Sequence, residues 1–77
     1  MEDMDIPIAL LQKRHAAIHA WTEASKVQTK REYVSAGEVY LVLADAEKED
    51  HRRAEAYHRA AVCFQAALLF PSSLKRT

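Results

Sequence analysis

Apolar residues recur along most of this chain every three or four positions, the period of an α-helix that buries one face. The pattern predicts helices at residues 6–25, 30–46 and 51–70, followed by a short tail at 71–77. In the first helix the expected core stripe is Ile8, Leu11, Ile18 and Trp21, widened by Leu10, Ala17 and Ala24. The fold class expected is all-α: a small antiparallel three-helix bundle or helical hairpin, forming one domain.

Few residues mark the ends of these helices. Asp5 and Pro7 indicate a start, with Asp5 as the N-cap and Pro7 in the first turn, where its missing N–H costs nothing. Thr29 and Glu32 form a capping box, which places the start of the second helix at about residue 30. Pro71 predicts the end of the third helix, because the residue before a proline is pushed out of the α region.

The second segment has two possible structures. As a helix, it would turn one line of side chains inward: Tyr33, Ala36, Gly37, Tyr40, Leu43 and Ala44. As a β-hairpin at 31–44, it would place Gly37 in the turn and "VYLVL" in a buried strand, for an α-β-β-α arrangement. The capping box and the alanine-rich surroundings favour the helix.

The third segment contains the run "AAVCFQAALLF" at 60–70, in which Gln65 is the single polar residue. "EKED" before it reads as a turn, with Asp50 as the next cap. The expected core seam is Ala54, Tyr57, Ala61, Phe64 and Leu68. Two short helices cannot surround a helix that is apolar all round, so a second chain is expected to cover its remaining sides. The predicted protein interface is Val62, Leu69, Phe70, Ala56, Ala60 and Cys63. Alternatively, Val62 and Leu69 are singly exposed apolar residues, which are common.

Charge and composition narrow the possible functions. Eleven basic and eleven acidic residues give a net charge of zero, so the basic excess typical of nucleic-acid binding is missing. One cysteine allows no internal disulfide, and no apolar run approaches the roughly 20 residues that span a bilayer. The N-terminus is acidic, unlike a signal peptide. A soluble cytoplasmic protein without a membrane partner is expected.

Residues that could carry chemistry are sparse. His15 and His19 lie four apart, a spacing that can chelate a metal, and Glu55 with His58 is a single Glu-x-x-His element. A di-iron bundle needs two such elements and two more glutamates, so these side chains are expected to be solvated. Cys63 lies in the apolar run, where a thiol is more often inert. No cofactor, metal site or catalytic residue is predicted.

"AGEVY" at 36–40 followed by "AEAYHRAAVCFQAALLFP" at 54–71 resembles the two helices of a tetratricopeptide repeat. The resemblance covers Tyr33–Pro71 and rests on Gly37 before Tyr40, then on Ala60, Phe64, Ala67 and Pro71. It departs from the family because the connection is too long, Pro71 comes one position early and no second copy follows. The resemblance implies a helical module that binds protein.

The function expected from these observations is a non-enzymatic protein–protein interaction module, acting as a homodimer, adaptor or inhibitor through an apolar helix surface. Its partner would be another protein, itself, or both. A small DNA-binding regulator is the alternative function, and a metal-binding helical bundle is the third.

Overall fold

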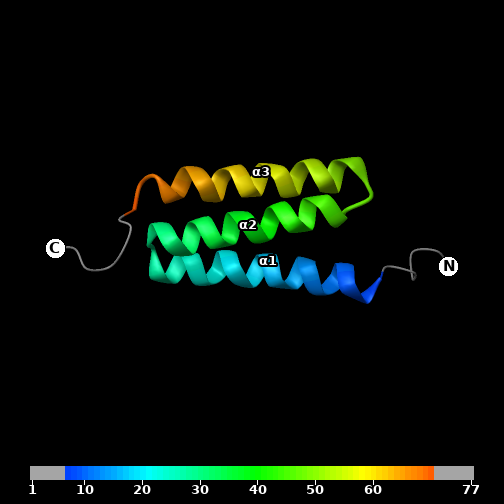
Figure 1. Ribbon diagram of the computed structural model, residues 1–77, viewed down its shortest axis with the longest axis horizontal. Coiled ribbons are helices and arrows are strands. Elements are labelled where there is room, and N and C mark those ends of the chain that lie inside the picture. The colour runs from blue at the N-terminus through cyan, green and yellow to red at the C-terminus, as the bar shows by residue number, and fades with distance from the viewer. Residues whose placement is uncertain (1–6, 71–77) are drawn as a thin grey trace.

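A computed structural model describes residues 7–70, which form three helices: α1 (Ile8–Val27), α2 (Lys30–Ala46) and α3 (Asp50–Ala67). They lie side by side as one layer, with α2 in the middle and each helix antiparallel to the next (Figure 1). The prediction of a small all-α helical bundle is confirmed. The alternative hairpin at 31–44 is wrong, because these residues lie within α2.

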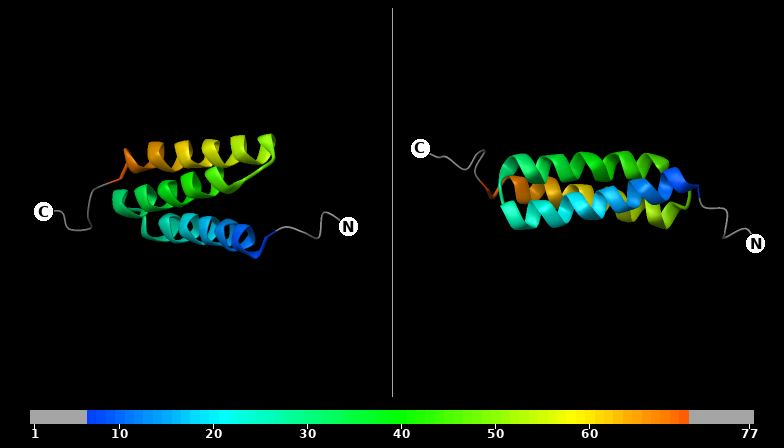
Figure 2. Two further views of the ribbon diagram at one scale, coloured as in Figure 1. Left: turned by 45° about the vertical axis from the view of Figure 1, so that its right-hand side comes forward. Right: turned by 90° about the horizontal axis from the view of Figure 1, so that it is seen from below.

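The layer is bent, with α2 on its convex side. α2 packs along both α1 and α3, whereas α1 and α3 touch each other far less. Seen from below, α1 and α3 are both displaced to the same side of α2 (Figure 2). The outer faces of α1 and α3, and the convex face of α2, therefore have none of the described helices packed on them.

The ends of α1 differ from the predicted ones. Pro7 occupies the N-cap position itself, and the predicted cap, Asp5, lies outside the described residues. α1 continues two residues beyond the expected 25, to Val27. It ends at Gln28, which adopts the left-handed conformation with φ 58° and donates its N–H to the Ala24 carbonyl over 2.8 Å.

α2 begins where the capping residues predict. The hydroxyl of Thr29 accepts a hydrogen bond from the Glu32 N–H at 3.4 Å, which is one half of a capping box. Thr29 is buried at this helix start, so the bond also satisfies a polar group removed from water.

α3 begins one residue earlier and ends three residues earlier than expected. Glu49, not Asp50, is the N-cap, and Asp50 lies in the first turn, where a carboxylate is favoured by the helix dipole. After Ala67 the chain tightens, and Leu68 N–H bonds to the Gln65 carbonyl at 3.1 Å. The predicted stop at Pro71 lies outside the described residues.

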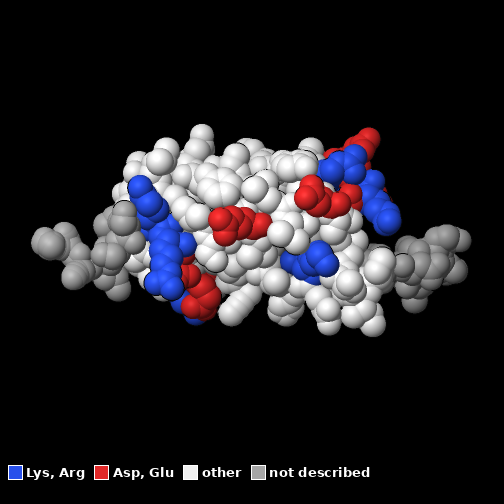
Figure 3. Space-filling model, in the orientation of Figure 1, with Lys and Arg blue, Asp and Glu red and all other residues white. Residues whose placement is uncertain are grey.

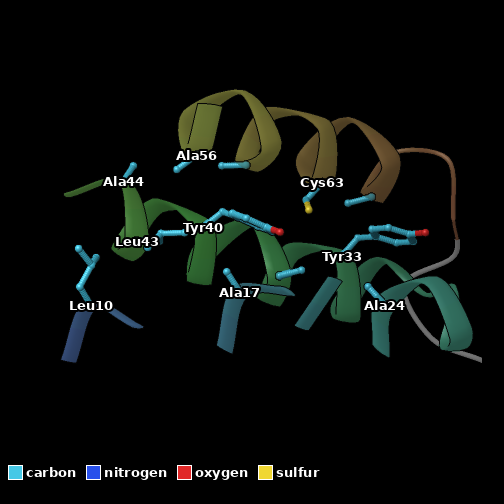
Figure 4. Close-up of a cluster of buried hydrophobic side chains, with 12 residues drawn as sticks. Leu10, Ala17, Ala24, Tyr33, Tyr40, Leu43, Ala44, Ala56 and Cys63 are labelled. Carbon is cyan, nitrogen blue, oxygen red and sulfur yellow. The ribbon is translucent and has the colours of Figure 1, made fainter. Parts of the chain in front are cut away.

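The core is made mainly of small side chains. α2 contributes the line predicted for it, and α1 and α3 each contribute a line rich in alanine (Figure 4). The buried residues of the three helices are Leu10, Ala17, Ala24, Tyr33, Ala36, Gly37, Tyr40, Leu43, Ala44, Ala56, Ala60, Cys63 and Ala67. Small side chains let helix axes approach closely, so dispersion contacts form between backbones as well as side chains.

The predicted core face of α1 is right in part, and that of α3 is wrong. On α1, Leu10, Ala17 and Ala24 are buried and Trp21 packs against the core as predicted, whereas Ile8, Leu11 and Ile18 are exposed. On α3 the seam of large residues lies outside the core: Ala54, Tyr57, Ala61 and Leu68 are exposed, and Phe64 is partly buried. Helical period alone cannot choose between two apolar lines on one helix. The choice was made by how closely the helices pack.

Candidate protein interface

A strip of large apolar side chains runs along the junction of α2 and α3 on the convex side of the layer. Its residues, here called the α2–α3 strip, are Val34, Leu41, Tyr57, Ala61, Phe64 and Leu68. Leu41 is 38% exposed, Tyr57 45% and Leu68 76%. Exposed apolar side chains that adjoin one another mark contact surfaces more often than isolated ones do.

Two contacts set the register of the antiparallel helices along this strip. The Tyr57 hydroxyl donates to Asp45 Oδ1 over 3.2 Å, and a Cβ on Gly37 would lie 2.7–3.0 Å from the Phe64 ring. Because the two helices are antiparallel, residue numbers rise along α2 as they fall along α3. Leu41, halfway between Gly37 and Asp45, therefore lies across from Ala61. Phe64 reaches into the junction because Gly37 has no side chain there.

Two carboxylates border the strip on α2. Glu38 and Asp45 are seven residues apart, so they lie on one line of the helix. Within residues 7–70, neither has a basic group within 4 Å, and Glu32, also on α2, has none. The other described carboxylates each have such a partner: Glu23, Glu47, Glu49, Asp50 and Glu55.

The space-filling view shows how charged side chains are distributed on the face that α2 presents. With α2 toward the viewer, separate acidic groups lie on a largely uncharged middle, and most of the basic groups gather toward the ends (Figure 3). Arg31, seven residues before Glu38, occupies the basic end of the same helical line. The strip therefore combines apolar area with uncompensated negative charge.

The six interface residues predicted from sequence do not form one surface. Ala56, Ala60 and Cys63 are buried against the rest of the chain. Val62 is partly buried, and Phe70 stacks on Tyr33 with ring centroids 5.2 Å apart. Leu69 is 81% exposed at the end of α3. The sequence signal that could have found the strip was present: α3 carries more apolar lines than one neighbouring helix can cover.

The outer face of α1 carries a second apolar group. Ile8 and Leu11 are exposed there, beside His15 and His19, whereas the exposed Ile18 lines the hollow between α1 and α3. The two histidines therefore share a face, as their spacing predicted. Among the described residues, no three His, Cys, Asp or Glu side chains are grouped so that they could hold a metal ion. Glu55 pairs with Arg59 at 3.0 Å.

A hollow of about 180 Å³ lies in the concave side, between α1 and α3. At one end Arg14 donates Nε and Nη2 to the two carboxylate oxygens of Glu47, at 2.8 and 2.9 Å. These bonds hold the pKa of the buried Glu47 below its ordinary value. Arg53 donates to the Glu47 carbonyl at 3.1 Å, so this residue joins all three helices.

Tyr40 and Arg59 also line the hollow, and both contact Trp21 next to it. Arg59 lies 5.5 Å above the Trp21 ring, and Trp21 meets Tyr40 edge to face at 5.7 Å. The Tyr40 hydroxyl is fully buried and forms no hydrogen bond of normal geometry with the described residues. The closeness of this hydroxyl to Arg59 raises the pKa of the Arg59 guanidinium, and the contact of Arg59 with Glu55 raises it further. A ligand would reach this hydroxyl only by displacing the side chains that cover it.

The position of the single thiol disfavours its reaction. Cys63 is buried in the α2–α3 packing, and burial raises its pKa, which disfavours the thiolate.

Comparisons with known proteins add no relationship: no family model, no curated protein and no solved structure gives a significant match to this chain. None of the helices in residues 7–70 has the length and apolar character needed to cross a membrane. The resemblance of Tyr33–Pro71 to a tetratricopeptide repeat stays a prediction.

Proposed function

We propose that the protein is a non-enzymatic protein–protein interaction module that docks its partner on the α2–α3 strip. The observation that carries this proposal is the strip itself, where large apolar side chains from two helices adjoin beside carboxylates that no described cation neutralises. Fully burying one such side chain contributes on the order of 1.5–3 kcal/mol, so a few suffice for a specific contact.

The single-layer architecture supports a role in binding. Each outer helix packs on one neighbour, and the core consists largely of alanine. Small side chains bury little apolar area, so the chain has much to gain in stability when another chain covers its convex face. Homodimer, adaptor and inhibitor are three ways to use such a surface.

The chemistry of the polar groups supports a function without catalysis. Cys63 is buried with a raised pKa, and the carboxylate of Glu47 is occupied by Arg14. All four histidines are exposed on the surfaces of α1 and α3, as polar residues of a helix commonly are.

The test measures the mass of the full chain by size-exclusion chromatography with light scattering, over a range of concentrations. Leu41→Glu places a charge in the strip, Leu11→Glu places one on the outer face of α1, and Leu69→Glu places one at the end of α3. All three positions are exposed. A wild-type dimer that only Leu41→Glu separates supports a homodimer formed through the strip.

A monomeric wild type excludes the homodimer, so that any partner of the strip is a different protein, as for an adaptor or inhibitor. A dimer that survives Leu41→Glu and is lost in Leu11→Glu or Leu69→Glu overturns the proposed docking surface. Circular dichroism of each variant shows whether the helices remain folded, so a loss of mass is not confused with unfolding.

A further inference from the structure

We propose that the segment that docks on the α2–α3 strip is an amphipathic helix of another protein, with two Lys or Arg residues seven positions apart beside its apolar line. This inference rests on the proposed function and adds the chemistry of the partner. It is carried by the spacing of Glu38 and Asp45, and by the fact that no basic group of residues 7–70 pairs with either of them.

The spacing of the two carboxylates suits a helix. Seven residues of α2 span about 10.5 Å at roughly 1.5 Å per residue, and a partner helix aligned with α2 advances by the same amount. Two cations seven positions apart on that helix therefore meet Glu38 and Asp45 together. The apolar line between them would cover Leu41 and reach Tyr57 and Phe64 across the junction.

The charges around the strip favour a cation over its middle. Arg31 lies at one end of the same line. From α3, Arg53 is engaged with Asp50 and with the Glu47 carbonyl. His58, on that side, is exposed, and so is Lys48, three residues after Asp45. Glu38 and Asp45 are the charged side chains of α2 that border the strip between Arg31 and Lys48.

Within residues 7–70, a second copy of this chain does not offer such a pair free of contacts inside the chain. Arg52 and Arg59 are seven apart, but Arg52 pairs with Glu49, and Arg59 pairs with Glu55 and covers Trp21. On α1, Arg14 is held by Glu47, and Lys26 lies 3.5 Å from Glu23. Docking any of these cations would first break a contact inside the chain. The other described cations, Lys13, Lys30, Arg31 and Lys48, include no two that are seven positions apart, which favours a different protein as the partner.

Ion pairs and buried apolar side chains contribute different amounts of binding free energy. Exposed ion pairs contribute about 0.2–1 kcal/mol each, whereas the buried apolar side chains contribute most of the affinity. The carboxylates therefore favour a partner helix with positive charge and fix its register along α2. Their effect weakens as the salt concentration rises.

The experiment measures binding of three fluorescent 18-residue peptides to the full chain by anisotropy. The first is an amphipathic helix of Leu and Lys with two Lys seven apart beside the apolar line. The second replaces Lys by Glu, and the third is a scrambled Leu/Lys sequence. We expect the first to bind most tightly, and Glu38→Gln with Asp45→Asn to weaken it by roughly three- to tenfold at low salt.

Glu32→Gln is the matched control, because Glu32 is another unpaired carboxylate of α2 but lies on the side facing away from α3. It should leave binding unchanged. Equal binding of the Leu/Lys and Leu/Glu peptides, or no effect of the double variant, overturns the charge inference while leaving the strip as a docking surface. Peptide binding that Leu41→Glu does not weaken overturns the proposed function as well.

Failure of all three peptides to bind overturns the inference. If the wild type is then a dimer that Leu41→Glu separates, the occupant of the strip is a second copy and the proposed function stands.

Discussion

Gly37 shows how a single residue sets the distance between two helices. A Cβ at this position would lie 2.7–3.0 Å from three atoms of the Phe64 ring, closer than carbon atoms pack. Glycine in a helix interior costs roughly 1 kcal/mol relative to alanine, so its presence needs a steric reason. The ring of Phe64 is that reason.

We therefore predict that Gly37→Ala destabilises the protein by about 1–3 kcal/mol despite its better helix propensity, because the ring must move out of the junction. Urea unfolding followed by circular dichroism measures the change. Combining it with Phe64→Leu should restore part of the loss, since the smaller side chain leaves room for the methyl group. A Gly37→Ala variant as stable as the wild type would contradict the contact.

Glu47 is the residue through which stability depends on pH. Its pKa is lowered in the folded protein, chiefly by the hydrogen bonds from Arg14. A group with a depressed folded pKa stabilises the protein above its ordinary value of 4.5, and that contribution is lost as the pH falls through the folded pKa. The relevant range is acidic.

We predict that Glu47→Gln costs roughly 1–3 kcal/mol near neutral pH, because Arg14 loses a charged, buried partner. The variant should also lose less stability than the wild type between about pH 6 and about pH 3. Glu55→Gln is the control, since the exposed pair of Glu55 with Arg59 is worth little. Parallel pH curves for the wild type and Glu47→Gln would rule out this role.

Among the helices, α3 has two lines of apolar residues, and the line with the smaller side chains is the one buried against α2. Ala56, Ala60, Cys63 and Ala67 pack inward, and the larger line borders the surface. Sequence reasoning assigned these faces the other way round, because large apolar residues usually form the core. In a close-packed pair of helices, however, small residues permit the nearest approach.

Adjacent alanines of α3 allow this face assignment to be tested by placing leucine at each of the two positions in turn. Ala60 is 1% exposed and Ala61 is exposed. Ala60→Leu should destabilise by about 1–3 kcal/mol or more through overpacking, whereas Ala61→Leu should change stability by less than about 0.5 kcal/mol. Thermal or urea unfolding distinguishes them. If Ala61→Leu is the more damaging change, the helix is rotated relative to the structure described.

At the scale of the whole molecule, the three helices form an open layer whose convex and outer faces carry apolar side chains. A closed bundle would have placed such side chains inside, as the core expected for α1 and α3 assumed. Because α1 and α3 pack on α2 more than on one another, their remaining faces stay at the surface. The proposed docking surface is a consequence of this arrangement.

Features that depend on neighbours along the chain could be predicted from the amino-acid sequence. These are the helical period, the cap at Thr29 and the inward line of α2, because they follow from local hydrogen bonds and from a helix with one apolar line. Which faces of α1 and α3 are buried, and where Phe64, Glu47 and the α2–α3 strip lie, is known only from the packing of the helices. These depend on the distance and register between helices, which period does not encode and which the packing of alanine and Gly37 sets.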